Sequence, residues 1–224
     1  MTEKYFERMP QKLRIQHIIL IIAFTLLMIS GGLLLYNDSW LANILISSEF
    51  LFTIRGIIHR VSALLLIGLC LFHAWYVIFT KEGREFFTEM LPNWDDVINF
   101  FQLLKYYLGF SKNKPQYGRF NFIEKFEYGA VAWGSAIMIL TGFILWFEGI
   151  SLIIFPKWIL DISLIMHSFE AILAFLTIII WHMYNVHLNP DVFPMSRVWL
   201  DGKMSEEELK KKHPAYYDKI RKNE

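Results

Sequence analysis

Six of the seven histidines in this 224-residue chain lie inside or at the ends of long apolar stretches. An ionisable side chain is costly in such surroundings, so each of them is a functional candidate. They are His17, His59, His73, His167, His182 and His187. A neutral imidazole is a common ligand of transition metals and of haem iron, and ligation is therefore the chemistry that these residues suggest.

Four of the histidines form two sets with nearly equal spacing. His73 is the fourteenth residue after His59, and His182 is the fifteenth after His167. At about 100° per residue, these intervals return a helix to within about 40–60° of the same face and span about 21–22 Å. That separation accommodates two haems stacked across a hydrocarbon core about 30 Å thick.

Four apolar stretches are long enough to position these residues within a membrane. They cover residues 17–36, 57–80, 128–147 and 159–186, and a transmembrane helix needs about 20 residues. Composition agrees, because 55% of the residues are hydrophobic and only 19% are charged, against about 25% charged in soluble domains. The sequence therefore predicts an all-α integral membrane protein, with a four-helix haem-binding bundle over residues 1–200 and a short charged tail over 201–224.

The connection between the second and third spans contains a further apolar pattern. Residues 94–108 carry apolar side chains at helical spacing. This pattern predicts a helix that lies in the plane of the membrane interface, in contact with lipid. A loop helix packed on neighbouring protein would give the same pattern. In the tail, Ser205 and Glu208 have the spacing of a helix N-cap.

Lysine and arginine are distributed very unequally along the chain. Four precede the first span, seven lie between the second and third spans, and eight follow residue 190. Only Arg55, Arg60 and Lys157 remain for the other side, so 19 of the 22 basic residues mark one face. Basic loops stay cytoplasmic. Both termini are therefore predicted to be cytoplasmic, and the second and fourth helices are predicted to run in the same direction.

This parallel arrangement determines which histidines meet. His59 is expected to face His167 near the outer surface, and His73 to face His182 near the inner surface. Each pair offers two imidazoles to one iron and leaves no position open for a substrate, which suits electron transfer. A zinc site is the competing interpretation, but it requires further ligands at one depth, and Glu170 is the only candidate acid well inside the spans.

His17 and His187 remain, both at the cytoplasmic ends of their helices. In an α-helix His187 would point about 140° away from His182. Three alternatives stay open: a third haem held by these two residues, replacement of His73 by His17 as the partner of His182, or a quinone pocket.

Other residues near the histidines have two interpretations each. Small residues would admit a flat ring, or would equally allow close packing of helices. They are Gly31, Gly32, Gly68, Gly134 and Gly142. Arg55 and Arg60 flank His59, where they could pair with haem propionates or extend toward lipid headgroups.

Composition excludes several other classes of protein. A net charge of +1 gives no indication of nucleic-acid binding. The single cysteine, Cys70, rules out an intrachain disulfide, a cysteine-built metal or iron–sulfur site and the attachment of c-type haem.

A series of short motifs extends along nearly the whole chain. They are Arg14-x-Gln16-His17, Ile58-His59-Arg60, Gly118-Arg-Phe-Asn121 with Glu124-Lys125, Thr141-Gly-Phe-Ile-Leu-Trp-Phe147, His167, Trp181-His182 and Lys212-His213-Pro-Ala-Tyr-Tyr217. In this order they resemble the gamma (cytochrome b) subunits of respiratory formate dehydrogenases and their relatives among the bacterial cytochrome b561-like, quinone-linked di-haem subunits. The resemblance implies that the haem ligands are His17, His59, His167 and His182.

The resemblance also implies a function. The chain would be a quinone-reactive or non-catalytic subunit of an oxidoreductase complex in the cytoplasmic (inner) membrane. It would carry electrons through at least two b haems between the quinone pool and a periplasmic redox subunit, either a multihaem c cytochrome or an iron–sulfur protein. The alternative is a membrane anchor or transport protein whose histidines bind metal and no haem.

The residue spacing and the resemblance differ at the inner haem. Membrane depth and helical phase favour His73 as the partner of His182, whereas the resemblance assigns that role to His17. If His73 takes the inner haem, His17 and His187 are free to hold a third.

Overall fold

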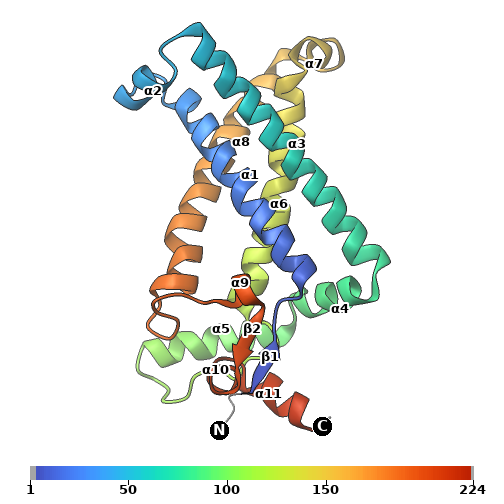
Figure 1. Ribbon diagram of the computed structural model, residues 1–224, viewed down its shortest axis with the longest axis vertical. Coiled ribbons are helices and arrows are strands. Elements are labelled where there is room, and N and C mark those ends of the chain that lie inside the picture. The colour runs from blue at the N-terminus through green and yellow to red at the C-terminus, as the bar shows by residue number, and fades with distance from the viewer. Residues whose placement is uncertain (1–3, 223–224) are drawn as a thin grey trace. The chain divides into compact units, whose positions relative to one another are not determined.

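The computed structural model describes residues 4–222 and is almost entirely helical (Figure 1). Two short strands, β1 (Tyr5–Glu7) and β2 (Lys203–Ser205), lie near the two ends of the chain. The helices are α1 (Gln11–Leu35), α2 (Trp40–Leu45), α3 (Glu49–Phe79), α4 (Lys81–Met90), α5 (Trp94–Tyr107), α6 (Phe122–Trp146), α7 (Glu148–Ile154), α8 (Lys157–Leu176), η1 (Thr177–His182), η2 (Tyr184–Leu188), α9 (Val198–Asp201), α10 (Glu206–Lys212) and α11 (Pro214–Arg221).

Four helices are long and apolar enough to cross a membrane. They are α1, α3, α6 and the run Lys157–Leu188, which joins α8 to η1 and η2. No more than 11% of the most apolar stretch of any of them is buried inside the chain. Such a large exposed apolar surface is typical of a multi-pass membrane protein surrounded by lipid, and the four long apolar helices that the sequence predicted are confirmed.

The chain forms two compact units. The first contains the residues up to Arg14, Trp75–Ala130 and the residues from Ser196 onward, and the second contains Ile15–Ala74 and Val131–Met195. The first unit thus collects the three segments that carry 19 of the 22 basic residues. This association is expected of segments that leave the membrane on the same face.

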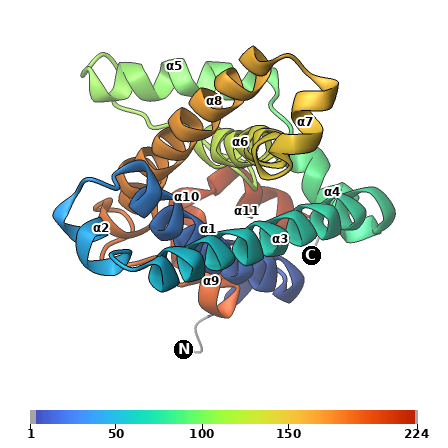
Figure 2. The same ribbon diagram turned by 90° about the horizontal axis from the view of Figure 1, so that it is seen from above.

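Within the second unit, α1 packs against α3, and α6 packs against α8 (Figure 2). The end of the fourth span departs from α-helical geometry. Residues Thr177–His182 and Tyr184–Leu188 form π-helical turns, and Asn189 N donates to the Tyr184 carbonyl five residues earlier at 2.8 Å. Wide turns of this kind occur frequently at functional sites.

The wide turns change the direction of two histidines. A turn closed by i→i+5 hydrogen bonds advances less than about 100° per residue. The interval from His167 to His182 therefore comes closer to a whole number of turns than α-helical geometry would give. For the same reason the separation of His182 and His187 around the helix is smaller than the value of about 140° expected from an α-helix.

A buried polar cluster joins the three segments of the first unit. Arg8 is only 6% exposed; its Nη2 lies 3.2 Å from His213 Nε2, and its guanidinium lies over the rings of Phe120 and Tyr216. On the other side of the imidazole, His213 Nδ1 is 2.8 Å from the Gly118 carbonyl oxygen. Because a carbonyl only accepts, Nδ1 carries the proton and Nε2 accepts from Arg8, which makes His213 neutral.

The start of α6 lies at the same cluster. Asn121 and Glu124 cap the helix reciprocally, with backbone-to-side-chain distances of 2.8 and 2.9 Å. Lys125 Nζ pairs with Asp96 Oδ2 at 2.8 Å, and both side chains are nearly buried. A buried charge requires such a partner, so this ion pair fixes α5 against the beginning of α6.

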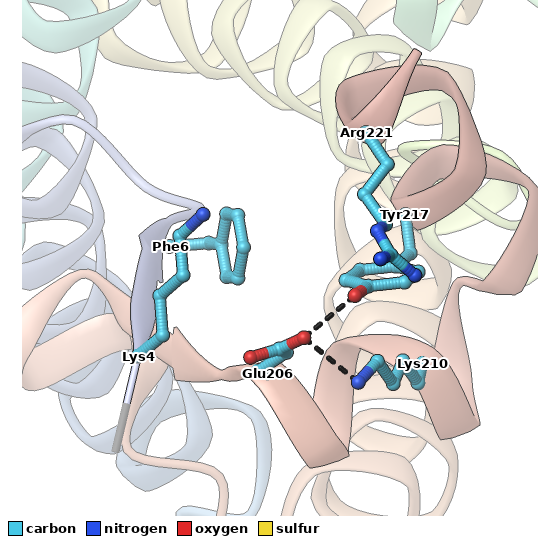
Figure 3. A pocket seen from close by; sticks show the side chains of 6 residues that line it. All are labelled: Lys4, Phe6, Glu206, Lys210, Tyr217 and Arg221. Atoms are coloured by element: carbon cyan, nitrogen blue, oxygen red, sulfur yellow. Dashed lines mark hydrogen bonds and ion pairs between the residues drawn. The ribbon is translucent and has the colours of Figure 1, made fainter. Parts of the chain in front are cut away.

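The two ends of the chain meet in an antiparallel β1–β2 pair, with Phe6 opposite Met204. Ser205 then caps α10 by accepting from Glu208 N, as the sequence predicted. A pocket beside β1 is lined by Lys4, Phe6, Glu206, Lys210, Tyr217 and Arg221 (Figure 3). Its carboxylate, that of Glu206, already accepts from Lys210 at 2.7 Å and from the Tyr217 hydroxyl at 2.6 Å. These bonds connect α10 to α11.

The neutral state of His213 predicts a pH dependence of stability. Burial, and then the charge of Arg8, lower the pKa of His213 to about 3, whereas in the unfolded chain the pKa is about 6.5. The stability that depends on the neutral imidazole is complete above a pH of about 6.5 and is lost as the pH falls from there toward 3. At about 1.4 kcal/mol per pH unit, the loss is about 2 kcal/mol by pH 5.

The variant His213→Gln, which does not titrate, provides the reference. In thermal unfolding of the detergent-solubilised full chain, the wild-type midpoint should fall relative to that of the variant between pH 7 and pH 5. Parallel curves for the two proteins would contradict a buried, neutral His213.

Candidate functional site

Two pairs of histidine rings face each other in the second unit. His59 of α3 and His167 of α8, the outer pair, have ring centroids 6.4 Å apart and planes inclined by 62°. His17 of α1 and His182 of η1, the inner pair, have centroids 6.3 Å apart and planes inclined by 65°. A metal–imidazole bond is about 2 Å long and a ring nitrogen lies about 1 Å from the ring centre, so two axial imidazoles on one metal have centroids about 6 Å apart. Both pairs have this spacing.

The outer pair is the one that the sequence predicted. Its two residues come from parallel helices and were expected at the same depth, and the structure brings their rings together.

The inner pair differs from the one that helical phase favoured. His182 faces His17, while His73 Nδ1 lies 2.7 Å from Gln16 Oε1. The ring contact therefore favours His17, the residue that the family resemblance implies, as the partner of His182. Helical phase takes account of the second and fourth helices only. In the structure, α1 lies beside both of them, and its His17 faces the fourth helix while its Gln16 contacts His73 of α3.

His59 is held by two consecutive residues of α1. Ser30 Oγ lies 3.0 Å from His59 Nδ1. A Cβ added at Gly31 would lie 3.3 Å from His59 Cε1, which leaves no room for a side chain without movement of the ring. Arg55 Nη1 donates to the Ser30 carbonyl at 3.1 Å and connects α3 to the same point of α1.

His167 is held in the same way by two consecutive residues of α6. Thr141 Oγ1 lies 2.9 Å from His167 Nδ1. A Cβ added at Gly142 would lie 3.4 Å from His167 Cε1. Both histidines of the outer pair thus have a hydroxyl at Nδ1 and a glycine against Cε1.

The other glycines of the spans do not contact histidines in this way. A Cβ at Gly134 would lie 2.6 Å from Glu170 Oε1, so this glycine makes room for the only candidate acid well inside the spans. Added Cβ atoms at Gly32 and Gly68 would meet nothing within 4 Å. The sequence did not distinguish these cases, and it gave no role to Ser30 or Thr141. The available signal was a hydroxyl residue directly before a glycine in two different spans.

The competing metal-site interpretation lacks the ligands that it needs. Across residues 4–222, no group of three or more His, Cys, Asp and Glu side chains gathers closely enough to hold a metal ion. Two pairs of histidine rings face each other, His59 with His167 and His17 with His182. A pair of imidazoles on opposite sides of a planar cofactor suits haem ligation.

Comparison with known proteins agrees with this geometry. Residues 8–192 match the model of a protein family described as prokaryotic cytochrome b561. The chain belongs to this family. It is therefore a transmembrane cytochrome b, with haem b as its cofactor and electron transport as its role, and the resemblance drawn from the sequence motifs is confirmed.

Among individual proteins, the relatives have low sequence identity to this chain. The cytochrome b556(fdo) subunit of formate dehydrogenase from Escherichia coli K12 is 24% identical to this cytochrome over 211 residues, which are 93% of this chain and 90% of the relative. The corresponding subunits from the O6:H1 and O157:H7 strains give the same values.

Gly31 and Gly32 form a matched pair for a test of the site. Gly31→Ala should displace the His59 ring by a few tenths of an ångström, whereas Gly32→Ala adds a methyl group to open space. We expect purified Gly31→Ala protein to have a lower haem content or a shifted reduced spectrum, and Gly32→Ala protein to match the wild type. Identical spectra and haem contents for both variants would show that the contact at residue 31 has no role.

Proposed function

We propose that this cytochrome carries electrons across the cytoplasmic membrane through two b haems, between the quinone pool and a periplasmic redox partner. The observation that carries the proposal is the pair of ring separations, 6.4 Å for His59–His167 and 6.3 Å for His17–His182. Each fits two axial imidazoles on one iron. Haem supplies the one-electron redox chemistry when it is bound, and the chain supplies ligation, spacing and charge.

The two pairs lie at different depths. On α1, His17 belongs to the inner pair, and Ser30, nearly four helical turns further on, contacts the outer pair. The α-helix between these two residues extends about 20 Å, which agrees with two haems inside a hydrocarbon core about 30 Å thick. Because each pair of imidazoles would fill both axial positions of a haem iron, these sites would suit electron transfer rather than substrate binding.

We assign the inner haem to His17 and His182, in place of His73 and His182. With His17 engaged in this way, a third haem held by His17 and His187 has no support. His73 and His187 then belong to the surroundings of the inner haem, where a quinone pocket remains the proposal for them.

Two arginines lie near the outer pair. Arg55 donates to Ser30, beside His59, and lies over the Phe52 ring, while Arg60 lies over the Trp146 ring. Haem propionates are carboxylates, for which guanidinium groups are the preferred partners. We propose Arg55 and Arg60 as the propionate-binding residues of the outer haem.

The proposed partner and orientation rest on other observations. The relative named above is a formate dehydrogenase subunit, so we propose that this chain also serves a larger oxidoreductase complex, with a multihaem c cytochrome or an iron–sulfur protein on the periplasmic side. The first unit holds the segments that carry most of the basic residues. By the positive-inside rule we place it, with both termini, in the cytoplasm.

Haem counting tests this proposal and the ligand assignment together. A pyridine haemochrome assay should give two b haems per wild-type chain. His59→Ala and His167→Ala should each remove the outer haem and keep the inner one, because the remaining imidazole has no opposite partner. His17→Ala should remove the inner haem, and His73→Ala should retain both.

One haem or none per wild-type chain would refute the two-haem architecture. Loss of the inner haem in His73→Ala, with retention in His17→Ala, would refute the revised ligand assignment alone.

We also propose that α5 lies in the membrane interface. Its polar residues Asp96, Asn99 and Gln102 are half-buried against the chain, while Trp94 is 76% exposed and Phe101 54% exposed. A helix in water has the opposite arrangement.

The charges and aromatic groups around this apolar face indicate lipid as its partner. Lys105 lies in the last turn of α5, and Lys112 and Lys114 follow it. Basic residues beside an apolar helix face attract anionic headgroups, and tryptophan and tyrosine are enriched at this depth.

Spin labels on opposite faces of α5 test this placement, since Cys70 is the only native cysteine. In a Cys70→Ser background, a label at Phe101→Cys in lipid vesicles should be accessible to oxygen and protected from a water-soluble nickel reagent. The matched label at Asn99→Cys should lack the preference for oxygen. Access of nickel to residue 101 would place α5 in water, and protection from both reagents would indicate a protein partner; either result contradicts contact with lipid.

A further inference from the structure

The two histidines of the outer pair share one local arrangement. Ser30–Gly31 on α1 and Thr141–Gly142 on α6 each place a hydroxyl at an imidazole Nδ1, at 3.0 and 2.9 Å. Each also places a glycine against Cε1 of the same ring. The same hydroxyl–glycine arrangement thus holds the histidine in both helix pairs, α1 with α3 and α6 with α8.

The direction of these hydrogen bonds follows from the hydroxyls' other contacts. Ser30 Oγ lies 2.6 Å from the Leu26 carbonyl oxygen, four residues earlier in its own helix. Thr141 Oγ1 lies 2.7 Å from the Ile137 carbonyl in the same relation. A carbonyl only accepts, so each hydroxyl gives its single proton to its own helix.

The hydroxyl can then only accept from the histidine. Nδ1 of His59 and Nδ1 of His167 therefore carry their protons, and Nε2 of each ring keeps its lone pair. A serine or threonine bonded to the carbonyl four residues earlier is common in helices. Its presence at both outer histidines, each time before the glycine that contacts the ring, points to a role in ligation.

We propose that Ser30 and Thr141 are positioning residues of the outer haem, which hold His59 and His167 in the tautomer and orientation that direct both Nε2 atoms at one iron. This inference rests on the proposed function and assigns the residues that act through its ligands. A hydrogen bond from the distal N–H of a ligating histidine fixes the ring and increases its basicity. A more basic imidazole stabilises ferric iron over ferrous iron, so the hydroxyls lower the reduction potential of the outer haem.

Arg55 adds a second link at one of the two positions. Its guanidinium donates to the Ser30 carbonyl at 3.1 Å, so the α1 residue that accepts from His59 is itself bonded to the helix of His59. Ser30 is 3% exposed and Thr141 is 6% exposed. Water therefore has little access to replace either hydroxyl.

Redox titration of the holoprotein tests the proposal. Thr141→Val preserves shape and removes the hydroxyl, and Ser30→Ala does the same at the other ring. Each variant should shift the midpoint potential of the outer haem upward and alter its low-spin electron paramagnetic resonance signal, which reports the angle between the ligand planes. The double variant should shift further, while the inner haem keeps its potential.

Conservative variants and a matched control separate this role from general packing. Thr141→Ser and Ser30→Thr retain the hydroxyl and should restore the wild-type potential. Ser62 of α3 is 2% exposed and is not followed by a glycine; as a buried serine outside the two hydroxyl–glycine sequences, it is the control, and Ser62→Ala should leave the outer haem unchanged.

An unchanged outer-haem potential and resonance signal in both Thr141→Val and Ser30→Ala would overturn the inference, as would an equal shift in Ser62→Ala. Each of these results leaves the proposed function intact. Failure of the proposed function would instead be visible in the wild type, as the lack of two bis-histidine haems.

Discussion

An imidazole inside a membrane protein has two nitrogens that need partners, and an iron can take only one of them. The other must find an acceptor among helices whose backbone groups are already bonded. At the outer pair the acceptors are the hydroxyls of Ser30 and Thr141. Because these hydroxyls contact the imidazoles, the helices that carry them lie beside the helices of the ligands, and in each case the next residue is a glycine that lies close to the ring.

This requirement gives α1 two tasks at different depths. It contributes a histidine to the inner pair, and about 20 Å further along it supports a histidine of the outer pair. Its rotation about its axis must satisfy both. The fourth span also contributes a histidine to each pair. Its π-helical turns around His182 bring that residue closer to the face of His167, because α-helical geometry alone would leave the two residues about 60° apart.

The first unit has a different chemical character from the spans. It is assembled around buried polar groups: Arg8 contacts the neutral His213 and Glu124, and Lys125 pairs with Asp96. Leaving one partner of such a cluster unpaired is expensive, so the N-terminal, connecting and C-terminal segments are fixed together. Several motifs that carried the family resemblance, including Gly118 and His213, take part in this packing rather than in the haem site.

The four apolar spans, the grouping of the basic segments and the His59–His167 pair were predictable from sequence. Each of these depends on composition, on the distribution of basic residues between spans or on periodicity within one helix, all of which can be read from the sequence. Only the three-dimensional structure showed that the His17 ring, which the resemblance had implied as the partner, faces His182, that the fourth span ends in wide turns, and that Ser30 and Thr141 lie against the outer histidines. Periodicity specifies which residues share a face of a helix, but packing of side chains between helices determines which face of a neighbour that helix meets.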